Sequence, residues 1–235
     1  MTASRVVPFD RLELKFAPQR WRFADDRRAE IDAGFAALRR TNPALWNGQV
    51  LMLHQHAIEG SLFRGAFLQT DYASFRMWHD WGHPDPDMRD CFAQAVLLSS
   101  DGALLLGVMN QHTAVPGKLH FPSGTPDPND IAGDTVDLDA SVWRELKEET
   151  GLTAAELVPD PTWHAVFCGT TIAMMKVFRS REDAVSLRER IRGNLAQQHP
   201  PELNDMYIVR GPNETDPMMQ DFIMAFLPYF WTKLR

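Results

Sequence analysis

The sequence predicts a fold of the mixed α/β class, in which strands and helices follow one another along one chain. Two strand-like segments flank Asp101-Gly102, a dipeptide that is typical of a tight hairpin turn. Helical spacing of apolar residues appears in the segment 27–40, and a helix is also expected at 139–150. The 235 residues are 44% apolar and 23% charged, which allows a sizeable core and argues against disorder.

The N-terminal part contains helix and strand patterns and ends in a cluster of turn residues, GHPDPD at 82–87. We therefore expect a division into an N-terminal α/β extension, residues 1–88, packed on a core domain, residues 89–235. The elements expected in the extension are a strand at 5–17, a helix at 27–40 that stops before Asn42-Pro43, hairpin strands at 49–57 and 61–69 joined through Glu59-Gly60, and a short aromatic helix at 71–80.

The core domain is expected to alternate strands and helices around one long polar loop. Its terminal segment is apolar at helical spacing and contains Pro228, so we expect a helix packed on the core or in a dimer interface rather than on a membrane. The elements expected are strands at 91–100 and 103–110, a loop at 111–138, a helix at 139–150, strands at 163–169 and 172–178, a helix at 182–197, a strand at 206–210, and a final helix from 218.

Composition excludes several classes of protein. The formal charge of −7 is opposite to what a general nucleic-acid surface needs, and RNA decapping is disfavoured for the same reason. No apolar stretch reaches about 18 residues and the N-terminus lacks a signal-peptide core, so a cytoplasmic location without a membrane span is expected. The two cysteines, Cys91 and Cys168, are too few for a disulfide framework or a cysteine zinc site, and we interpret them as core thiols.

The segment expected as a helix at 139–150 carries the clearest chemical signal. Glu145, Glu148 and Glu149 stand at positions i, i+3 and i+4, which share one face of a helix. Like charges at this spacing destabilise a helix unless a cation compensates them, and carboxylate oxygens favour hard divalent ions. A solvated acidic face is the plainer interpretation of the same residues. Gly151 follows, where a left-handed residue commonly ends a helix.

The order of residue types in Arg144-Glu145-Leu146-Lys147-Glu148-Glu149-Thr150-Gly151-Leu152 resembles the second half of the Nudix box. Phe121-Pro122-Ser123-Gly124 resembles the turn that opens the same box, and the resemblance extends over residues 91–210. It implies a Nudix fold, with a mixed β-sheet sandwiched between α-helices and here an N-terminal β-rich extension.

The same resemblance implies site residues. The metal ligands would be Glu145, Glu148, Glu149 and the carbonyl of Gly124, with Mg²⁺ or Mn²⁺ as the cofactor. Catalytic roles would belong to Glu148, Arg144 and Glu202, with either Glu148 or Glu202 as the general base. The glutamate at 202 is the first candidate for a carboxylate beyond the box, and Asp205 is the second.

The first half of the box departs from the family's pattern, G-x5-E-x7-REUxEExGU. Counting back from Arg144, the upstream glutamate should stand at 136, where the chain has Val136. If Gly133-Asp134 replaces the usual Gly-Glu pair, the segments before and after Asp134 have each grown. Asp134 is then the candidate to support the metal-bearing helix.

The resemblance implies hydrolysis of a phosphoanhydride bond in a nucleoside diphosphate linked to another moiety. The stretch 42–72 resembles the extension of a UDP-sugar diphosphatase branch, which makes a UDP-sugar one candidate substrate. The aromatic residues between Trp46 and Trp81 are expected to form the core of a small subdomain, with a stacking wall for a nucleobase as the alternative. The alternatives left open are a catalytically weak nucleotide sensor and a CoA or ADP-ribose pyrophosphatase. A homodimer is also left open, as is common for Nudix proteins.

Overall fold

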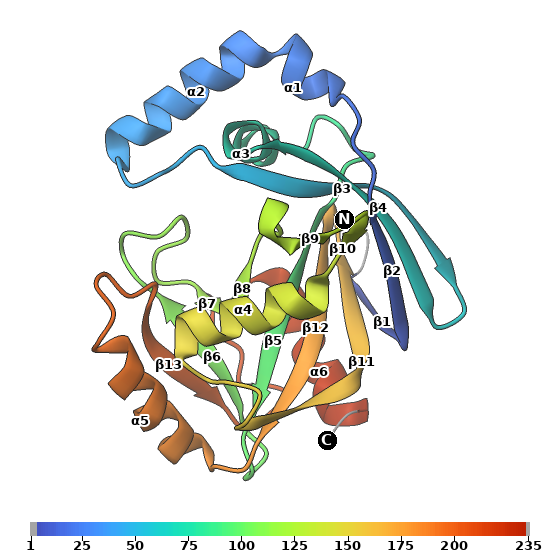
Figure 1. The fold of residues 1–235 in the computed structure, drawn as a ribbon. Helices are drawn as coiled ribbons and strands as arrows, with labels where there is room; N and C mark the ends of the chain where they lie inside the picture. The colour runs from blue at the N-terminus through green and yellow to red at the C-terminus, as the bar shows by residue number, and fades with distance from the viewer. Residues whose placement is uncertain (1–3, 234–235) are drawn as a thin grey trace.

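The computed structural model describes residues 4–233, which form two β-sheets and six α-helices (Figure 1). The helices are α1 (Arg22–Asp26), α2 (Arg28–Thr41), α3 (Tyr72–Asp80), α4 (Leu138–Thr150), α5 (Ala184–Leu195) and α6 (Asp221–Lys233). The larger sheet has the order β1-β11-β12-β5-β6-β13, with β7 paired to β6 and β8 paired to β5. Its strands are β1 (Arg5–Phe9), β5 (Asp90–Leu98), β6 (Leu104–Met109), β7 (Leu119–His120), β8 (Ser123–Gly124), β11 (Leu157–Cys168), β12 (Thr171–Ser180) and β13 (Leu203–Val209).

The larger sheet is mixed and is buried on both faces, as the sequence patterns require. Strands β5 and β12 pair in parallel, whereas the other pairings of this sheet are antiparallel. Along β5, Ala93, Ala95 and Leu97 belong to the core shared with α4 and α5, and Phe92 and Val96 belong to the core covered by α6. Because successive strand residues point to opposite faces, one strand serves both cores. The mixed sheet between helices that the resemblance implied is confirmed.

The smaller sheet, order β3-β4-β2-β10-β9, lies beside α2 and α3 (Figure 1). Its strands are β2 (Arg11–Phe16), β3 (Gln49–Glu59), β4 (Leu62–Asp71), β9 (Ile131–Ala132) and β10 (Thr135–Val136). Met52 and Leu68 pack with the helices in a third core, whereas Leu51 and Leu53 face the core shared with the larger sheet. The smaller sheet therefore joins the N-terminal helices to the rest of the chain.

The segment expected as one strand at 5–17 forms two strands that belong to different sheets. β1 pairs with β11 of the larger sheet, and after Asp10 the chain continues as β2, which pairs with β4 and β10 of the smaller sheet. The expectation of one continuous strand is therefore wrong. Strand pairing also crosses the division that we predicted at 88/89, because β1 joins the larger sheet and β9–β10 join the smaller one.

The terminal helix packs on the core. Phe222, Ile223, Phe226, Leu227 and Phe230 are buried against the face of the larger sheet that lies opposite α4. Within residues 4–233, no helix is long and apolar enough to cross a membrane. The apolar pattern of the segment is thus explained by burial in this protein.

The loop expected at 111–138 is not structureless, which is a second departure from the sequence-based expectation. It contains the short strands β7, β8, β9 and β10 and a 3-10 turn at Pro128–Asp130. The strands are two residues long, too short for an alternating pattern to be recognised. This segment leads directly into α4, whose first turn is capped by the Asp137 carboxylate accepting from the amide of Ala140 at 2.9 Å.

His164 of β11 offers a test of how α6 covers the sheet. Its ring is 2% exposed, and its Nδ1 lies 3.3 Å from the Tyr229 hydroxyl. Burial lowers the pKa of His164 from 6.5 to about 4. The neutral ring therefore contributes stability that is fully present above pH 6.5 and lost as the pH falls toward 4.

We predict that the free energy of unfolding of wild type minus that of His164→Gln falls as the pH is lowered from 6.5 to 4. The slope should approach about 1.4 kcal/mol per pH unit, because the wild-type unfolded state binds one more proton. Urea denaturation at several pH values measures this difference, and every other titrating group cancels in it. If the difference in free energy of unfolding between the two proteins does not change with pH, the burial of a neutral ring is contradicted.

Candidate active site

Helix α4 presents two of its three central glutamates toward the inside of the protein. Val142 and Leu146 anchor its apolar side in the core, and Gly151 ends it in the left-handed conformation with φ 76°. The Glu149 residue is 4% exposed and the side chain of Glu145 is 13% exposed. The side chain of Glu148 is 61% exposed and therefore points to solvent.

The loop that precedes α4 approaches these glutamates very closely. The backbone amide of Ser123 donates to the Glu149 carboxylate at 2.9 Å. A Cβ added to Gly124 would lie 2.4 Å from the Glu145 carboxyl carbon, a distance that no side chain can occupy without displacing the carboxylate. The glycine is thus required by the contact between loop and helix, and its backbone lies beside the carboxylate group.

Burial and mutual repulsion raise the pKa values of the carboxylates at this site. Burial raises the pKa of Glu145 to about 7, an effect opposed by Arg144 and reinforced by the charges of Glu148 and Glu202. The pKa of Glu149 is raised well above its ordinary value by burial and then by Glu202, and burial also raises that of Glu202. These carboxylates therefore lie near enough to repel one another without full compensation from the protein's own cations.

The donor set fits a hard divalent cation in charge and in chemistry. Carboxylate oxygens and a backbone carbonyl are the ligands that Mg²⁺ and Mn²⁺ favour, and the backbone of Gly124 lies directly beside the Glu145 carboxylate. In residues 4–233, however, no three Asp, Glu, His or Cys side chains stand together as a ready-made metal site. Glu145 is instead engaged by Arg144 at 2.5 Å, so the carboxylates would have to turn toward an ion.

The residue that supports α4 is Asp130, not Asp134 as the sequence suggested. Arg144 Nη2 donates to both carboxylate oxygens of Asp130 at 2.9 and 3.1 Å, and Ser141 Oγ donates at 3.0 Å. The side chain of Asp130 is 2% exposed. Asp134 is exposed, and its backbone carbonyl accepts from the amide of Phe16.

The position of Asp130 shows where the segment between Gly124 and Arg144 is longer than the pattern G-x5-E-x7-R. Five residues separate Gly124 from Asp130, as in the pattern G-x5-E, with aspartate in place of glutamate. The extension therefore lies wholly after Asp130, where β9 and β10 form, and Thr135 of β10 pairs with Lys15 of β2. Counting forward from Gly124, rather than back from Arg144, would have found the acidic residue.

The two carboxylates proposed from beyond the box lie in different surroundings. Glu202 lines the same cavity as Glu149 and Gly124. Asp205, the second candidate, pairs with Arg188 of α5, whose Nε donates at 3.0 Å. That ion pair holds α5 against β13, so Asp205 is accounted for as a structural residue.

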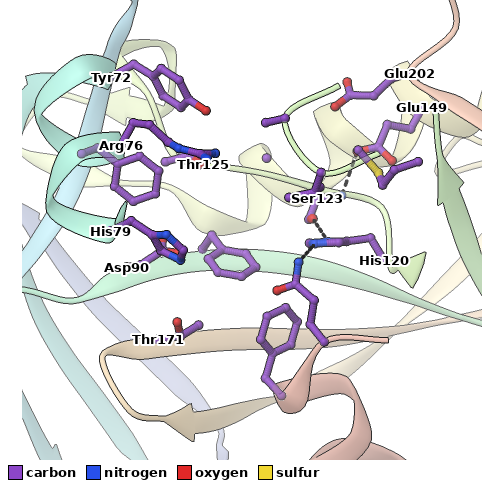
Figure 2. Close-up of a pocket in the computed structure, with 18 residues that line it drawn as sticks. Tyr72, Arg76, His79, Asp90, His120, Ser123, Thr125, Glu149, Thr171 and Glu202 are labelled. Carbon is purple, nitrogen blue, oxygen red and sulfur yellow. Dashed lines mark hydrogen bonds between the residues drawn. The ribbon is translucent and has the colours of Figure 1, made fainter. Parts of the chain in front are cut away.

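The cavity has a volume of about 280 Å³ and extends from the glutamates toward the N-terminal part of the chain. Figure 2 shows Tyr72, Arg76 and His79 of α3 along one wall, and Glu149 and Glu202 on the opposite wall. These α3 residues recur at i, i+4 and i+7, so one face of the helix lines the cavity. No local pattern indicates that this face meets the cavity beside the glutamate-bearing helix, because the contact joins segments far apart in the chain.

His120 and Asp90 are further cavity residues that the sequence did not single out. Burial lowers the pKa of His120 to about 4, and its ring nitrogens lie 3.0 Å from Gln94 Nε2 and 2.6 Å from Gln220 Nε2. The neutral ring packs edge-on against Phe222 at 5.9 Å. Asp90 is the first residue of β5 and pairs with Thr171 of β12, so both lie where the two parallel strands begin.

A second cavity of about 350 Å³ adjoins the first. The two share Tyr72, Ala114 and Glu202 as lining residues. The outer cavity also contains Trp46, whose indole is 80% exposed and lies over Gly48. Glu202 thus lies where the first, aromatic cavity (the inner cavity) meets the second (the outer cavity).

Comparisons with known proteins give solved structures only, since no family model and no curated protein matches the chain. A Nudix hydrolase from M. smegmatis, RenU, shares 14% identity over 60% of this chain and 82% of its own, with a TM-score of 0.39. The MutT protein from Methanosarcina mazei Go1 shares 16% identity over 61% and 94%, with a TM-score of 0.38. DR0079 from Deinococcus radiodurans shares 14% identity over 62% and 87%, with a TM-score of 0.42. We therefore rest the function on the residues of the site.

We predict that Asp130→Ala lowers the free energy of unfolding by about 3 kcal/mol, because Arg144 and Ser141 lose the buried carboxylate to which both donate. Asp134→Ala is the matched control, which should change stability by no more than about 0.5 kcal/mol. Urea denaturation of both variants measures the difference. Equal effects of the two substitutions would contradict the assignment of Asp130 as the support of α4.

Proposed function

We propose that this protein hydrolyses a phosphoanhydride bond in a nucleoside diphosphate linked to another moiety, with Mg²⁺ or Mn²⁺ as its cofactor. The observation that supports it best is the position of the glutamate-bearing helix. Glu149 and Glu202 line one end of the aromatic inner cavity, and Glu202 also lines the outer cavity. Glu145 lies close enough to both for their charges to interact. A two-part substrate joined by phosphates matches this shape.

The cation would be held by Glu145, Glu149 and the carbonyl of Gly124, with Glu148 able to join from the solvent side. When bound, it would supply positive charge to the phosphate oxygens and acidify a water molecule. Arg144, tied to Asp130, keeps the Glu145 carboxylate beside the loop. The Ser123 amide orients Glu149 by donating a hydrogen bond to its carboxylate.

We assign the proton acceptor for the attacking water to Glu202. It lines the cavity, whereas Glu148 is mostly exposed on the outer side of α4. A base must lie within hydrogen-bond reach of the proton that it removes, so the position of Glu202 in the cavity supports it over Glu148. Glu202 is held in place through its own carbonyl, which accepts from the amide of Asn110 at 2.9 Å.

Among substrates, a UDP-sugar is one member of the class, and ADP-ribose, NADH and CoA are others to be compared. The aromatic inner cavity is suited to a nucleoside, and the outer cavity with Trp46 to a second moiety such as a sugar. The sensor alternative differs in outcome: a sensor would be stabilised by ligand without turning it over.

We predict that Glu149→Gln and Glu202→Gln each lower kcat by about 10²-fold or more on the preferred substrate, in line with the loss of a metal-binding or proton-accepting group. The measurement is phosphate or nucleoside monophosphate release from the substrate panel with Mg²⁺ and with Mn²⁺. Glu189→Gln, on the exposed face of α5, is the control and should leave kcat unchanged. If wild type turns over no substrate of the panel faster than Glu149→Gln and Glu202→Gln do, the hydrolase assignment is contradicted.

We predict that Gly124→Ala weakens Mg²⁺ binding by about tenfold or more, because the added methyl group must displace Glu145. The readout is the rise in Tm on adding Mg²⁺, which needs no substrate. Gly193→Ala, at an open helix position of α5, is the control: it should retain the Mg²⁺ response and gain about 0.4–1 kcal/mol of stability. An undiminished Mg²⁺ response in Gly124→Ala would place the ion elsewhere.

A further inference from the structure

The end of the inner cavity farthest from the glutamates contains an acidic residue for which the proposed reaction has no use. Asp90 lies near His79 and on the side of the cavity away from Glu149 and Glu202, with Thr171 below it (Figure 2). Parallel pairing of β5 with β12 sets Asp90 beside Thr171, and Phe92 follows on the same face of β5. The position of Asp90 is thus fixed by sheet register.

The Asp90 carboxyl lacks compensation from the protein itself. Burial alone raises its pKa to about 7, and no hydrogen bond or cation among the described residues opposes this effect. Arg76, the cation of the neighbouring wall, instead donates to Asp80 of its own helix at 3.0 Å. Asp90 is half-buried in the cavity wall, and its carboxyl makes no side-chain hydrogen bond within residues 4–233, so it is free to accept one from a donor that arrives with a ligand.

The walls near Asp90 are flat and aromatic. Phe92 and Phe222 meet edge to face at 5.6 Å, and Phe75 of α3 lines the same cavity with its ring partly exposed. His120, kept neutral by burial, packs against Phe222 and adds no charge. Such a lining favours a planar ring over a hydrated, non-planar sugar.

We propose that Asp90 binds the N–H edge of a nucleobase and thereby sets the base preference of the protein. The carboxyl accepts hydrogen bonds from a ring N–H or an amino group, while Phe75 and Phe92 contact the faces of the ring. The orientation rests on the proposed function, which puts the phosphates at the Glu149 end and the second moiety in the outer cavity. Sites built to bind a buried N–H discriminate strongly against ligands that lack it.

The test uses calorimetric binding of nucleoside monophosphates without metal, so it does not depend on turnover. First the four ribonucleoside 5′-monophosphates identify the preferred base in wild type. We then expect Asp90→Asn to weaken binding of that nucleotide by about tenfold or more. Methylation of the base N–H should weaken binding to wild type by a similar factor and have little further effect on Asp90→Asn. Asp87→Asn, an exposed residue of the preceding loop, is the matched control.

Several results would overturn this assignment. Equal binding of all four nucleotides to wild type, or equal loss on methylation in wild type and Asp90→Asn, would remove the base contact. A change in preference among sugars at constant base, measured as kcat/KM, would assign Asp90 to the second moiety instead. Asp90→Asn should have a Tm no lower than wild type, because it removes a half-buried carboxyl that no cation of the cavity wall compensates; a lower Tm would indicate a structural role. Hydrolysis with unchanged base preference would contradict this inference and leave the proposed reaction standing.

Discussion

The buried ion pair between Asp130 and Arg144 is the contact on which the geometry of the site depends. It ties the 3-10 turn before β9 to the middle of α4, and Ser141 adds a hydrogen bond to the same carboxylate. Because the loop is held there, Gly124 and Ser123 approach Glu145 and Glu149 closely enough for direct contact. Loss of Arg144 would leave the buried Asp130 carboxylate without a cation, and loss of either partner would free the loop from the helix.

The same pair marks the point where the N-terminal part of the chain joins the site. Directly after Asp130, β9 and β10 leave the loop and add to the smaller sheet through β2. That sheet carries α3, whose Tyr72, Arg76 and His79 line the cavity. The extension of the motif between Asp130 and Arg144 is thus the connection that brings a wall from the first third of the chain to the glutamates.

The helix and the positions of its glutamates could be predicted from local sequence, whereas the surroundings of the site could not. Glu145, Glu148 and Glu149 at helical spacing, with Gly151 behind them, are read within one short segment. The break at Asp10, which sends β1 and β2 to different sheets, depends on partners far away in the chain. Asp90 was missed because a single acidic residue before a strand carries no local signal, and only sheet pairing sets it in the cavity.

Both ends of the cavity contain carboxyl groups whose charged forms the protein does not stabilise, Glu149 at one end and Asp90 at the other. This arrangement suits a ligand with a cation at the Glu149 end and N–H donors at the Asp90 end. The most direct measurement is a crystal structure with Mn²⁺ and a non-hydrolysable nucleoside diphosphate analogue. We expect an anomalous manganese peak among Glu145, Glu149 and the Gly124 carbonyl, with phosphate oxygens beside it. A manganese peak outside this group, or an analogue bound with its phosphates at the Asp90 end, would contradict the account.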